Sequence, residues 1–258
     1  MGIDNQIYDR LGDGWWDETN PLNTLNGSFT PGRFRYFRDV LRRLELDPAG
    51  LLAADIGCGG GFLAEEFAQL GCRVVGLDPS EVSVRTARGH AESSGLRVGY
   101  AVAMGERLPL ADGSVDIAYC CDVLEHVSDL DRVIDETARV LKPGGLYLFD
   151  TINRTRLSKL LVIKLLQDWQ PTRVVDSELH SWALFITPAE LAECLCRHGL
   201  RLAEITGLGP RANKASLLSN FTRARRGRIS FGELSRLMDV GQVDSTAVSY
   251  LGYALKTA

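Results

Sequence analysis

The sequence lacks a surplus of positive charge, a long apolar run and any CxxC cysteine pair. Its 258 residues include 29 lysines and arginines against 33 acidic residues, a net charge of -4. Because nucleic-acid binding relies on a surplus of Lys and Arg, a nucleic acid is not the expected partner. The most membrane-like stretch, Leu160–Leu166, contains Lys164 and is far shorter than the ~20 apolar residues that cross a bilayer. We therefore expect no transmembrane helix.

The first residues, MGIDNQIYDRLGDGWWDE, show no basic start followed by an apolar segment, so they do not resemble a secretory signal. We expect the protein to be cytoplasmic. Thiols stay reduced in the cytosol, and no two of the six cysteines have metal-binding or redox CxxC spacing. The cysteines are therefore expected to be free thiols, mostly buried in the core.

From residue 51 onward, short apolar runs alternate with helical segments. Strands are predicted near residues 51–57, 72–78, 96–103, 114–123, 146–151, 200–207 and 248–257. This alternation implies right-handed crossovers and a parallel sheet covered on both faces. The predicted fold class is α/β, a doubly wound and mostly parallel seven-stranded sheet of the Rossmann-like kind. The last strand is expected to pair with the edge of that sheet.

The same pattern divides the chain into four parts. Residues 1–50 form an N-terminal helical cap, with a helix from about Arg33 to Leu44. Residues 51–152 form the core, residues 153–186 a helical insertion, and residues 187–258 the C-terminal part of the core. Thr187, Pro188 and Glu190 form a capping box that begins a helix.

A glycine loop, DIGCGGG from Asp55 to Gly61, lies where a strand passes into a helix. Glycines there let a ligand approach the backbone, and the following helix N-terminus is electropositive. Asp78 ends the next strand, where an acid can accept hydrogen bonds from ribose hydroxyls. These residues indicate an adenosine site, but the spacing of Gly59, Gly61 and Ala64 also fits the GxGxxA form of a dinucleotide site. By themselves they leave NAD and S-adenosylmethionine both open.

The wider pattern resembles the class I S-adenosylmethionine-dependent methyltransferases. The loop and Asp78 are followed by ERLPLADGSVDIAY, LEHV and LKPGG, all within about residues 50–150. The resemblance implies S-adenosylmethionine as cofactor, with the loop beside its methionine part, Asp78 on its ribose and Met104 and Gly105 beside its adenine. Many members carry an acid where this chain has Met104, so Glu106 or backbone atoms would replace it. The residues implied to bind the cofactor in this core are Asp55, Gly57, Cys58, Gly59, Gly61, Asp78, Pro79, Met104, Gly105, Glu106 and Cys121.

Outside the core the sequence is most similar to the O-methyltransferases of ubiquinone biosynthesis, which methylate phenolic hydroxyls on polyprenylated rings. The similarity rests on WWDE at residues 15–18, Arg33, CCDVLEHV, TINRTRLSK and HSWALFITPAEL. It runs from about Trp15 to Gly207, and residues 213–246 are longer and more basic than expected. The resemblance implies that Arg33 contacts the carboxylate of the cofactor; the alternative is a surface arginine. Trp15 and Trp16 either line the acceptor pocket or pin the N-terminal segment to the core.

The stretch CCDVLEHV leaves two chemical roles open. In the relatives that it resembles, the positions of Asp122, Glu125 and His126 are associated with a divalent cation. Alternatively His126 is a lone general base, since an imidazole with a pKa near 6.5 is largely neutral at pH 7. His180, at the implied wall of the acceptor site, is the second catalytic candidate. A cysteine nucleophile is not expected, because the methyl group passes directly from sulfur to acceptor.

Residues 154–169 combine four basic side chains with a wide apolar face. Such a segment is either an interfacial helix making peripheral contact with a membrane or a lid over the pocket. The run RARRGR, residues 223–228, is expected to be a solvated loop.

The leading hypothesis is therefore an enzyme that methylates a phenolic or hydroxyquinol oxygen of a small aromatic acceptor, with or without a prenyl chain. The alternatives are an N- or C-methyltransferase of secondary metabolism, an NAD-dependent oxidoreductase, and a non-catalytic module that binds S-adenosylmethionine.

Overall fold

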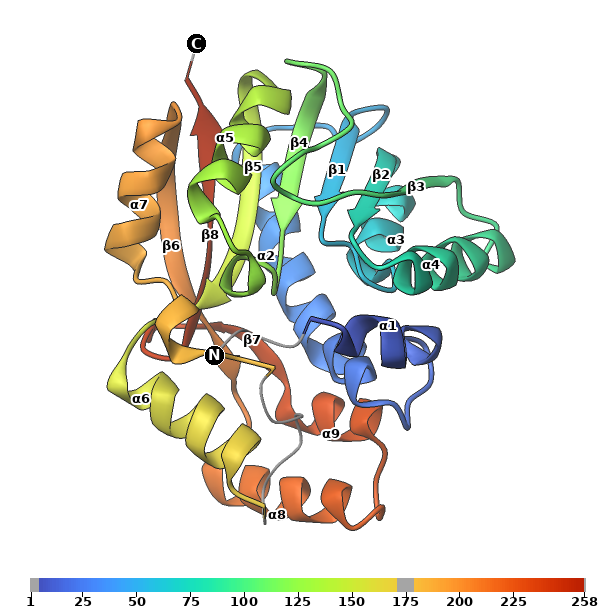
Figure 1. Ribbon diagram of the computed structural model, residues 1–258, viewed down its shortest axis with the longest axis vertical. Coiled ribbons are helices and arrows are strands. Elements are labelled where there is room, and N and C mark those ends of the chain that lie inside the picture. Colours follow the sequence, from blue (N-terminus) through green and yellow to red (C-terminus); the bar gives the residue numbers. More distant parts are fainter. Residues whose placement is uncertain (1–4, 171–178, 258) are drawn as a thin grey trace.

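A central eight-stranded sheet organises the computed structural model, which describes residues 5–170 and 179–257 (Figure 1). The strand order is β3-β2-β1-β4-β5-β8-β6-β7. Neighbours from β3 to β5 pair in parallel, β8 runs antiparallel to both β5 and β6, and β7 runs antiparallel to β6. The strands are β1 Leu52–Ile56, β2 Arg73–Asp78, β3 Val98–Val102, β4 Val115–Cys120, β5 Leu141–Ile152, β6 Leu200–Pro210, β7 Val240–Val243 and β8 Ser249–Lys256.

Helices surround this sheet and extend beyond its carboxyl end. The α-helices are α1 Ile7–Leu11, α2 Thr30–Arg43, α3 Phe62–Gln69, α4 Glu81–Ser93, α5 Leu130–Val140, α6 Arg156–Ser158, α7 Pro188–Arg197, α8 Lys214–Arg225 and α9 Phe231–Met238. Short 3-10 and π-helical segments are η1 Gly12–Gly14, η2 Pro21–Asn23, η3 Leu25–Phe29, η4 Leu124–His126, η5 Lys159–Asp168 and η6 Trp182–Leu184. No helix in the described part of the chain is both long enough and apolar enough to cross a membrane.

Alternating side chains of the central strands enter two separate cores. Tyr119 joins α2, α3 and α4 on one face, where its ring stacks on Phe67 with centroids 4.3 Å apart. Its neighbours Ala118 and Cys120 join α5 and α7 on the other face. Burying one large side chain of this kind contributes ~2–3 kcal/mol, so both faces are held by apolar packing. This arrangement confirms the doubly wound α/β fold.

The sequence prediction was wrong about the edge of the sheet. The seven predicted strands all form, but β8 lies between β5 and β6 rather than at the edge. Gly252 of β8 pairs with Phe149, and a Cβ on Gly252 would lie 2.3 Å from the Glu204 carbonyl oxygen and 2.8 Å from the Phe149 ring. The glycine therefore makes room for both neighbouring strands at this central position.

The eighth strand, β7, was missed, and it comes with the helices α8 and α9 from the basic stretch 213–246. Arg223 and Arg225 lie in the last turn of α8, so only the second half of the predicted loop RARRGR lies outside a helix. Gly32 lets α2 approach β7 closely, since a Cβ there would lie 2.2 Å from the Val240 carbonyl oxygen. The short strand is held by this contact and by its pairing with β6.

The carboxyl ends of β1, β4 and β5 point toward α1, η5, α8 and α9 (Figure 1). The insertion at residues 153–186 forms α6, η5 and η6 at this end, and its residues 171–178 lie outside the described part. Residues that follow these strands are thereby brought together beside α1.

Candidate functional site

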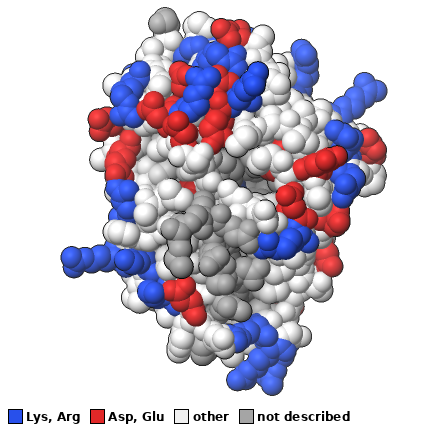
Figure 2. Space-filling view, viewed as in Figure 1, with Lys and Arg blue, Asp and Glu red and all other residues white. Residues whose placement is uncertain are grey.

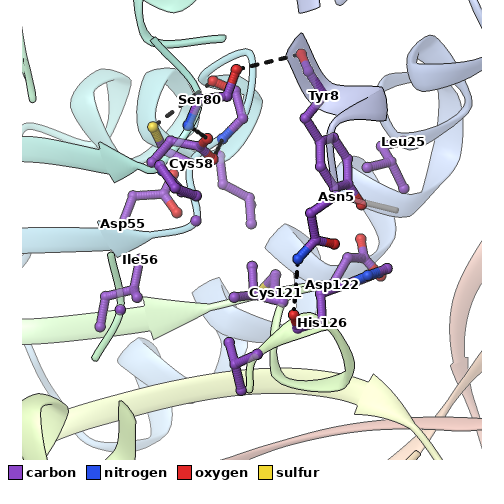
Figure 3. Close-up of a pocket in the computed structure, with 18 of the residues that line it drawn as sticks. Asn5, Tyr8, Leu25, Asp55, Ile56, Cys58, Ser80, Cys121, Asp122 and His126 are labelled. Carbon is purple, nitrogen blue, oxygen red and sulfur yellow. Dashed lines mark hydrogen bonds between the residues drawn. The ribbon is translucent and has the colours of Figure 1, made fainter. Parts of the chain in front are cut away.

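A cavity of about 410 Å³ lies at the carboxyl ends of β1, β2 and β4, with α1 across it (Figure 3). A volume of this size is within the range of small-molecule sites. Of the residues predicted to bind the cofactor, those that line the cavity are Arg33, Asp55, Gly57, Cys58, Gly59, Asp78, Pro79, Met104, Gly105, Glu106 and Cys121. Asp122 and His126 line it too, whereas Gly61, Glu125 and His180 are not among the lining residues. Gly61 is instead the N-cap of α3, with a φ of 84°, and a Cβ there would lie 2.4 Å from the Tyr100 hydroxyl.

The glycine loop is shaped by close approach as well as by backbone conformation. Gly57 and Gly59 have φ values of 77° and 49°, and a Cβ on Gly57 would lie 2.2 Å from Val123. The Gly59 amide donates a hydrogen bond of 2.8 Å to Asp78 Oδ2, and the Ser80 amide donates one of 2.9 Å to Asp78 Oδ1. Burial raises the pKa of Asp78, while these two hydrogen bonds lower it. The loop and the acid are thus fixed to one another before any ligand binds.

The buried carboxylate of Asp55, beside the glycine loop, can accept a hydrogen bond from a polar ligand. Asp55 is buried, and its Oδ2 atom has no hydrogen-bond partner within the described part of the protein. Burial and the charge of Asp78 raise the pKa of Asp55 well above its usual range. A ligand that donates a hydrogen bond here would satisfy an atom that the fold leaves unpaired.

The N-terminal segment contributes residues that no sequence motif indicated. Asn5 donates a hydrogen bond of 3.1 Å to the His126 carbonyl, and Tyr8 lines the cavity (Figure 3). Trp15 lines the cavity and covers the glycine loop, because a Cβ on Gly60 would lie 2.4 Å from it. Trp16 stacks on His90 with ring centroids 3.3 Å apart. Trp15 is thus a cavity wall, while Trp16 pins the segment to the core.

Arg33 joins two acids under the cavity. Its side chain is buried, with Nη2 2.5 Å from Asp122 Oδ2 and Nε 2.9 Å from Asp150 Oδ2. Asp122 has a φ of 54°, which places its carboxylate beside the arginine at the end of β4. Burial alone would lower the pKa of Arg33, but the two carboxylates raise it above its usual range. Arg33 is therefore a buried ion-pair centre and not the surface arginine of the alternative prediction.

The predicted cation ligands do not converge. Asp122 turns to Arg33, and Glu125 turns into the core, where it accepts a hydrogen bond of 2.8 Å from Thr151 Oγ1. Within residues 5–170 and 179–257, the ligand atoms of Asp122, Glu125 and His126 are not close enough together to form a candidate metal cluster. The structure therefore does not support a cation on these three residues.

Two histidines face one another beside the cavity. The rings of His126 and His180 lie 5.0 Å apart between centroids, and Tyr8 meets His126 edge-on at 6.0 Å. The Nδ1 atoms of both histidines are buried without a hydrogen-bond partner in the described chain. Burial lowers the pKa of His126 to about 4 and that of His180 to about 3, so both rings are neutral at pH 7.

Cysteines near the site are thiols rather than thiolates. Cys121 lines the cavity as the resemblance implies, and Cys120 is buried behind it. Burial raises the pKa of both thiols well above the usual range. Neither fits the role of a nucleophile, which needs the thiolate form.

Comparison with known proteins identifies the class of enzyme. Residues 54–149 match the methyltransferase domain family. A solved structure of a possible histamine N-methyltransferase from Thermotoga maritima shares the fold, with a TM-score of 0.64 over 98% of this chain and 99% of that one, at 18% identity. The fold, the glycine loop and the family match define an S-adenosylmethionine-dependent methyltransferase of class I.

Two curated relatives identify the family. The chain is 38% identical to the ubiquinone biosynthesis O-methyltransferase of Methylobacterium sp. (strain 4-46) over 211 residues, which are 78% of this chain and 82% of the relative. It is 35% identical to that of Xanthomonas axonopodis pv. citri (strain 306) over 249 residues, which are 95% of this chain and 90% of the relative. The chain belongs to the ubiquinone biosynthesis O-methyltransferase family. This confirms the predicted family and S-adenosylmethionine as cofactor, and decides against the NAD-dependent alternative.

Proposed function

We propose that the enzyme transfers a methyl group to a phenolic or hydroxyquinol oxygen of a small aromatic acceptor. The observation that carries this proposal is the pair of buried, unpartnered Nδ1 atoms on His126 and His180 in the described chain. A phenol must lose its proton to become a good nucleophile, and a neutral imidazole can accept one. An N-methyltransferase acting on a neutral amine needs no such base before attack, so the two imidazoles favour oxygen over nitrogen.

The residues proposed to hold the cofactor are those that line the cavity. Bound S-adenosylmethionine supplies an activated methyl group on its sulfonium. Asp78, fixed by Gly59 and Ser80, would accept hydrogen bonds from the ribose hydroxyls. Asp55 and the loop amides would hold the methionine part, while Trp15 and α1 would exclude water from the cavity.

The energetic problem for the chain is to ionise the acceptor. A phenol with a pKa of about 10 costs ~4 kcal/mol to ionise at pH 7, at ~1.4 kcal/mol per pKa unit. His126 is neutral but held in a site that disfavours its charged form, so it accepts a proton only as a phenolate forms beside it. Burial has the largest effect on the pKa of His180 and lowers it, while the charge of Asp122 opposes that effect. The phenolate and Asp122 therefore both stabilise an imidazolium formed in this pair.

Replacing His126 with asparagine is expected to lower kcat by about 100-fold at pH 7, with His180→Asn as the parallel variant. The assay follows labelled methyl transfer to a catechol-like acceptor. If His126 is the base, the deficit narrows as the pH rises toward 10, because the acceptor then ionises without help. His198→Asn is the control, since that ring lies away from the cavity. Losses below threefold in both variants, or a deficit constant with pH, contradict the role of a base.

We also propose that residues 154–169 are a lid over His180. Gln167 holds the His180 backbone from both sides, donating to its carbonyl at 3.1 Å and accepting from its amide at 2.9 Å. The outer face of the lid exposes Leu157, Leu160 and Trp169. Apolar side chains beside basic ones suit peripheral contact with an anionic bilayer, where a prenylated acceptor would reside.

This contact predicts co-sedimentation with vesicles that contain anionic lipid. Replacing both Leu160 and Trp169 with serine is expected to reduce the bound fraction at least about threefold, because the replaced side chains supply the apolar contact. Leu46→Ser is the matched control, as Leu46 is exposed after α2 and away from the lid. If the wild-type chain does not sediment, or if all three proteins sediment equally, membrane contact through this face is ruled out and the segment remains a lid.

A further inference from the structure

Two pairs of side chains of the types that can ligate a metal face each other between α5 and α7. Asp131 and Asp135 are four residues apart on α5, while Cys194 and His198 are four residues apart at the end of α7. Residues at this spacing lie on one face of a helix. The two faces meet where acidic and basic side chains intermingle in the upper part of the space-filling view (Figure 2).

The ligand atoms are arranged closely enough for one ion. Asp131 Oδ2 lies 3.1 Å from His198 Nε2, and Cys194 Sγ lies 3.7 Å from Asp131 Oδ1. One ligand atom from each of these three residues falls within 4.8 Å of the others. A tetrahedral zinc ion, with bonds of ~2.0 Å to N or O and ~2.3 Å to S, separates its N and O ligands by about 3.3 Å and its S and O ligands by about 3.5 Å. Small rotations of side chains would thus be enough to close the site.

Each ring nitrogen of His198 faces a carboxylate oxygen. Its Nδ1 lies 3.3 Å from Asp135 Oδ1, while its Nε2 faces Asp131. An imidazole that donates its Nδ1–H to Asp135 has its Nε2 lone pair free for a cation, and Asp131 is placed to bind the same cation. Within the described chain this Nε2 atom is buried without a hydrogen-bond partner. Zinc-bound histidines commonly have this arrangement, in which a carboxylate holds one ring nitrogen and the metal takes the other.

The cluster runs from the core to the surface. Cys194 is 2% exposed at the inner end, and Asp131 lies at the surface, where the Arg197 guanidinium is 2.5 Å from its Oδ1. An arriving cation would replace that arginine as the partner of Asp131. None of these residues lines the cofactor cavity.

We propose that Asp131, Cys194 and His198 bind a borderline divalent cation of the zinc type, with Asp135 orienting His198 and water as the fourth ligand. A thiolate, an imidazole and a carboxylate together favour zinc over magnesium or calcium. The ion would clamp α7 to α5, and with them the C-terminal part of the sheet to the core. It is a structural ion and takes no part in methyl transfer.

Titration of the reduced, metal-free, full-length protein with Zn²⁺ and Co²⁺ tests this site. One equivalent should bind, Co²⁺ should give a thiolate charge-transfer absorption, and Zn²⁺ should raise the melting temperature. Cys194→Ser should abolish the absorption and weaken binding by at least roughly 100-fold. Cys196→Ser is the matched control, because Cys196 is an exposed thiol on the same helix and should leave binding unchanged.

Asp131→Asn is a second variant for the case that Cys194→Ser folds poorly. Because Asp131 is at the surface, its replacement should weaken metal binding without loss of the fold. Methyl transfer by the wild-type protein should be the same with and without EDTA at a temperature far below melting. The proposal is overturned if the wild-type protein binds neither ion at micromolar concentrations. It is also overturned if Cys194→Ser and Asp131→Asn both bind as the wild type does, which would place the ion elsewhere.

Discussion

Replacing Arg33 with methionine is expected to lower the free energy of unfolding by ~4 kcal/mol, because it leaves a buried acid without its partner. Asp150 is 1% exposed and has Arg33 Nε at 2.9 Å, while Asp122 has Nη2 at 2.5 Å. Methionine keeps the apolar stem of the side chain but not the charge. Denaturation with urea at pH 7.5 measures the loss, and cofactor binding should weaken with it, since Arg33 lines the cavity.

The matched control is Arg42→Met on the same helix. Arg42 is exposed and pairs with Asp39 at 3.3 Å, so its loss should cost less than about 0.5 kcal/mol. Adding Asp150→Asn to the Arg33 variant removes the orphaned charge and should restore ~1–3 kcal/mol. Equal stability of the Arg33 and Arg42 variants, or no restoration by Asp150→Asn, would show that the ion cluster does not hold α2 to the sheet.

The fold was predictable where local pattern and tertiary role coincide. The apolar runs that became β1, β4 and β5 are buried on both sides, and the capping box at Thr187 and Glu190 is present in the structure. The insertion of β8 between β5 and β6 was not predictable, because it depends on whether Gly252 can accommodate Phe149. Such a fit between distant segments leaves no periodic signal in either one.

The residues of the candidate site were also predictable only in part. Gly57 and Gly59 follow β1, and Asp78 ends the neighbouring strand β2, so the parallel topology alone brings them together. The convergence of Asn5 and Tyr8 on His126 is different, since α1 is a five-residue helix whose position comes from contacts with α4 and the loop. The sequence also did not show in which direction the Glu125 side chain points. Glu125 is adjacent to His126 in sequence, yet it turns to Thr151 in the core.

The buried position of Glu125 leads to a second large expected effect: Glu125→Gln should stabilise the protein by ~4 kcal/mol at pH 9 and have little effect at pH 5. Burial, and then the charge of Asp122, raise the pKa of Glu125 to about 8. In the unfolded chain a glutamate titrates near ~4.3. The gap of roughly three to four units, at ~1.4 kcal/mol each, sets the size of the effect. Glutamine has the size of the protonated glutamic acid and stays neutral, because it has no acidic proton to release in this pH range.

The sign follows from which state holds the proton. Between about pH 4.3 and pH 8 the folded protein keeps Glu125 protonated while the unfolded chain has released its proton, so stability falls as the pH rises through this window. Asp150, whose pKa burial raises to about 7, contributes to the same decline in both proteins.

Urea denaturation at several pH values from about 5 to 9 measures this difference. Glu136→Gln is the control, because Arg139 holds the pKa of Glu136 below its usual range, and that variant should lie a constant amount below the wild type throughout. A Glu125→Gln curve parallel to the wild-type curve would mean that Glu125 is ionised in the folded protein. In that case Glu125 would be a buried carboxylate stabilised by its hydrogen bond from Thr151, and its replacement would not change how stability depends on pH.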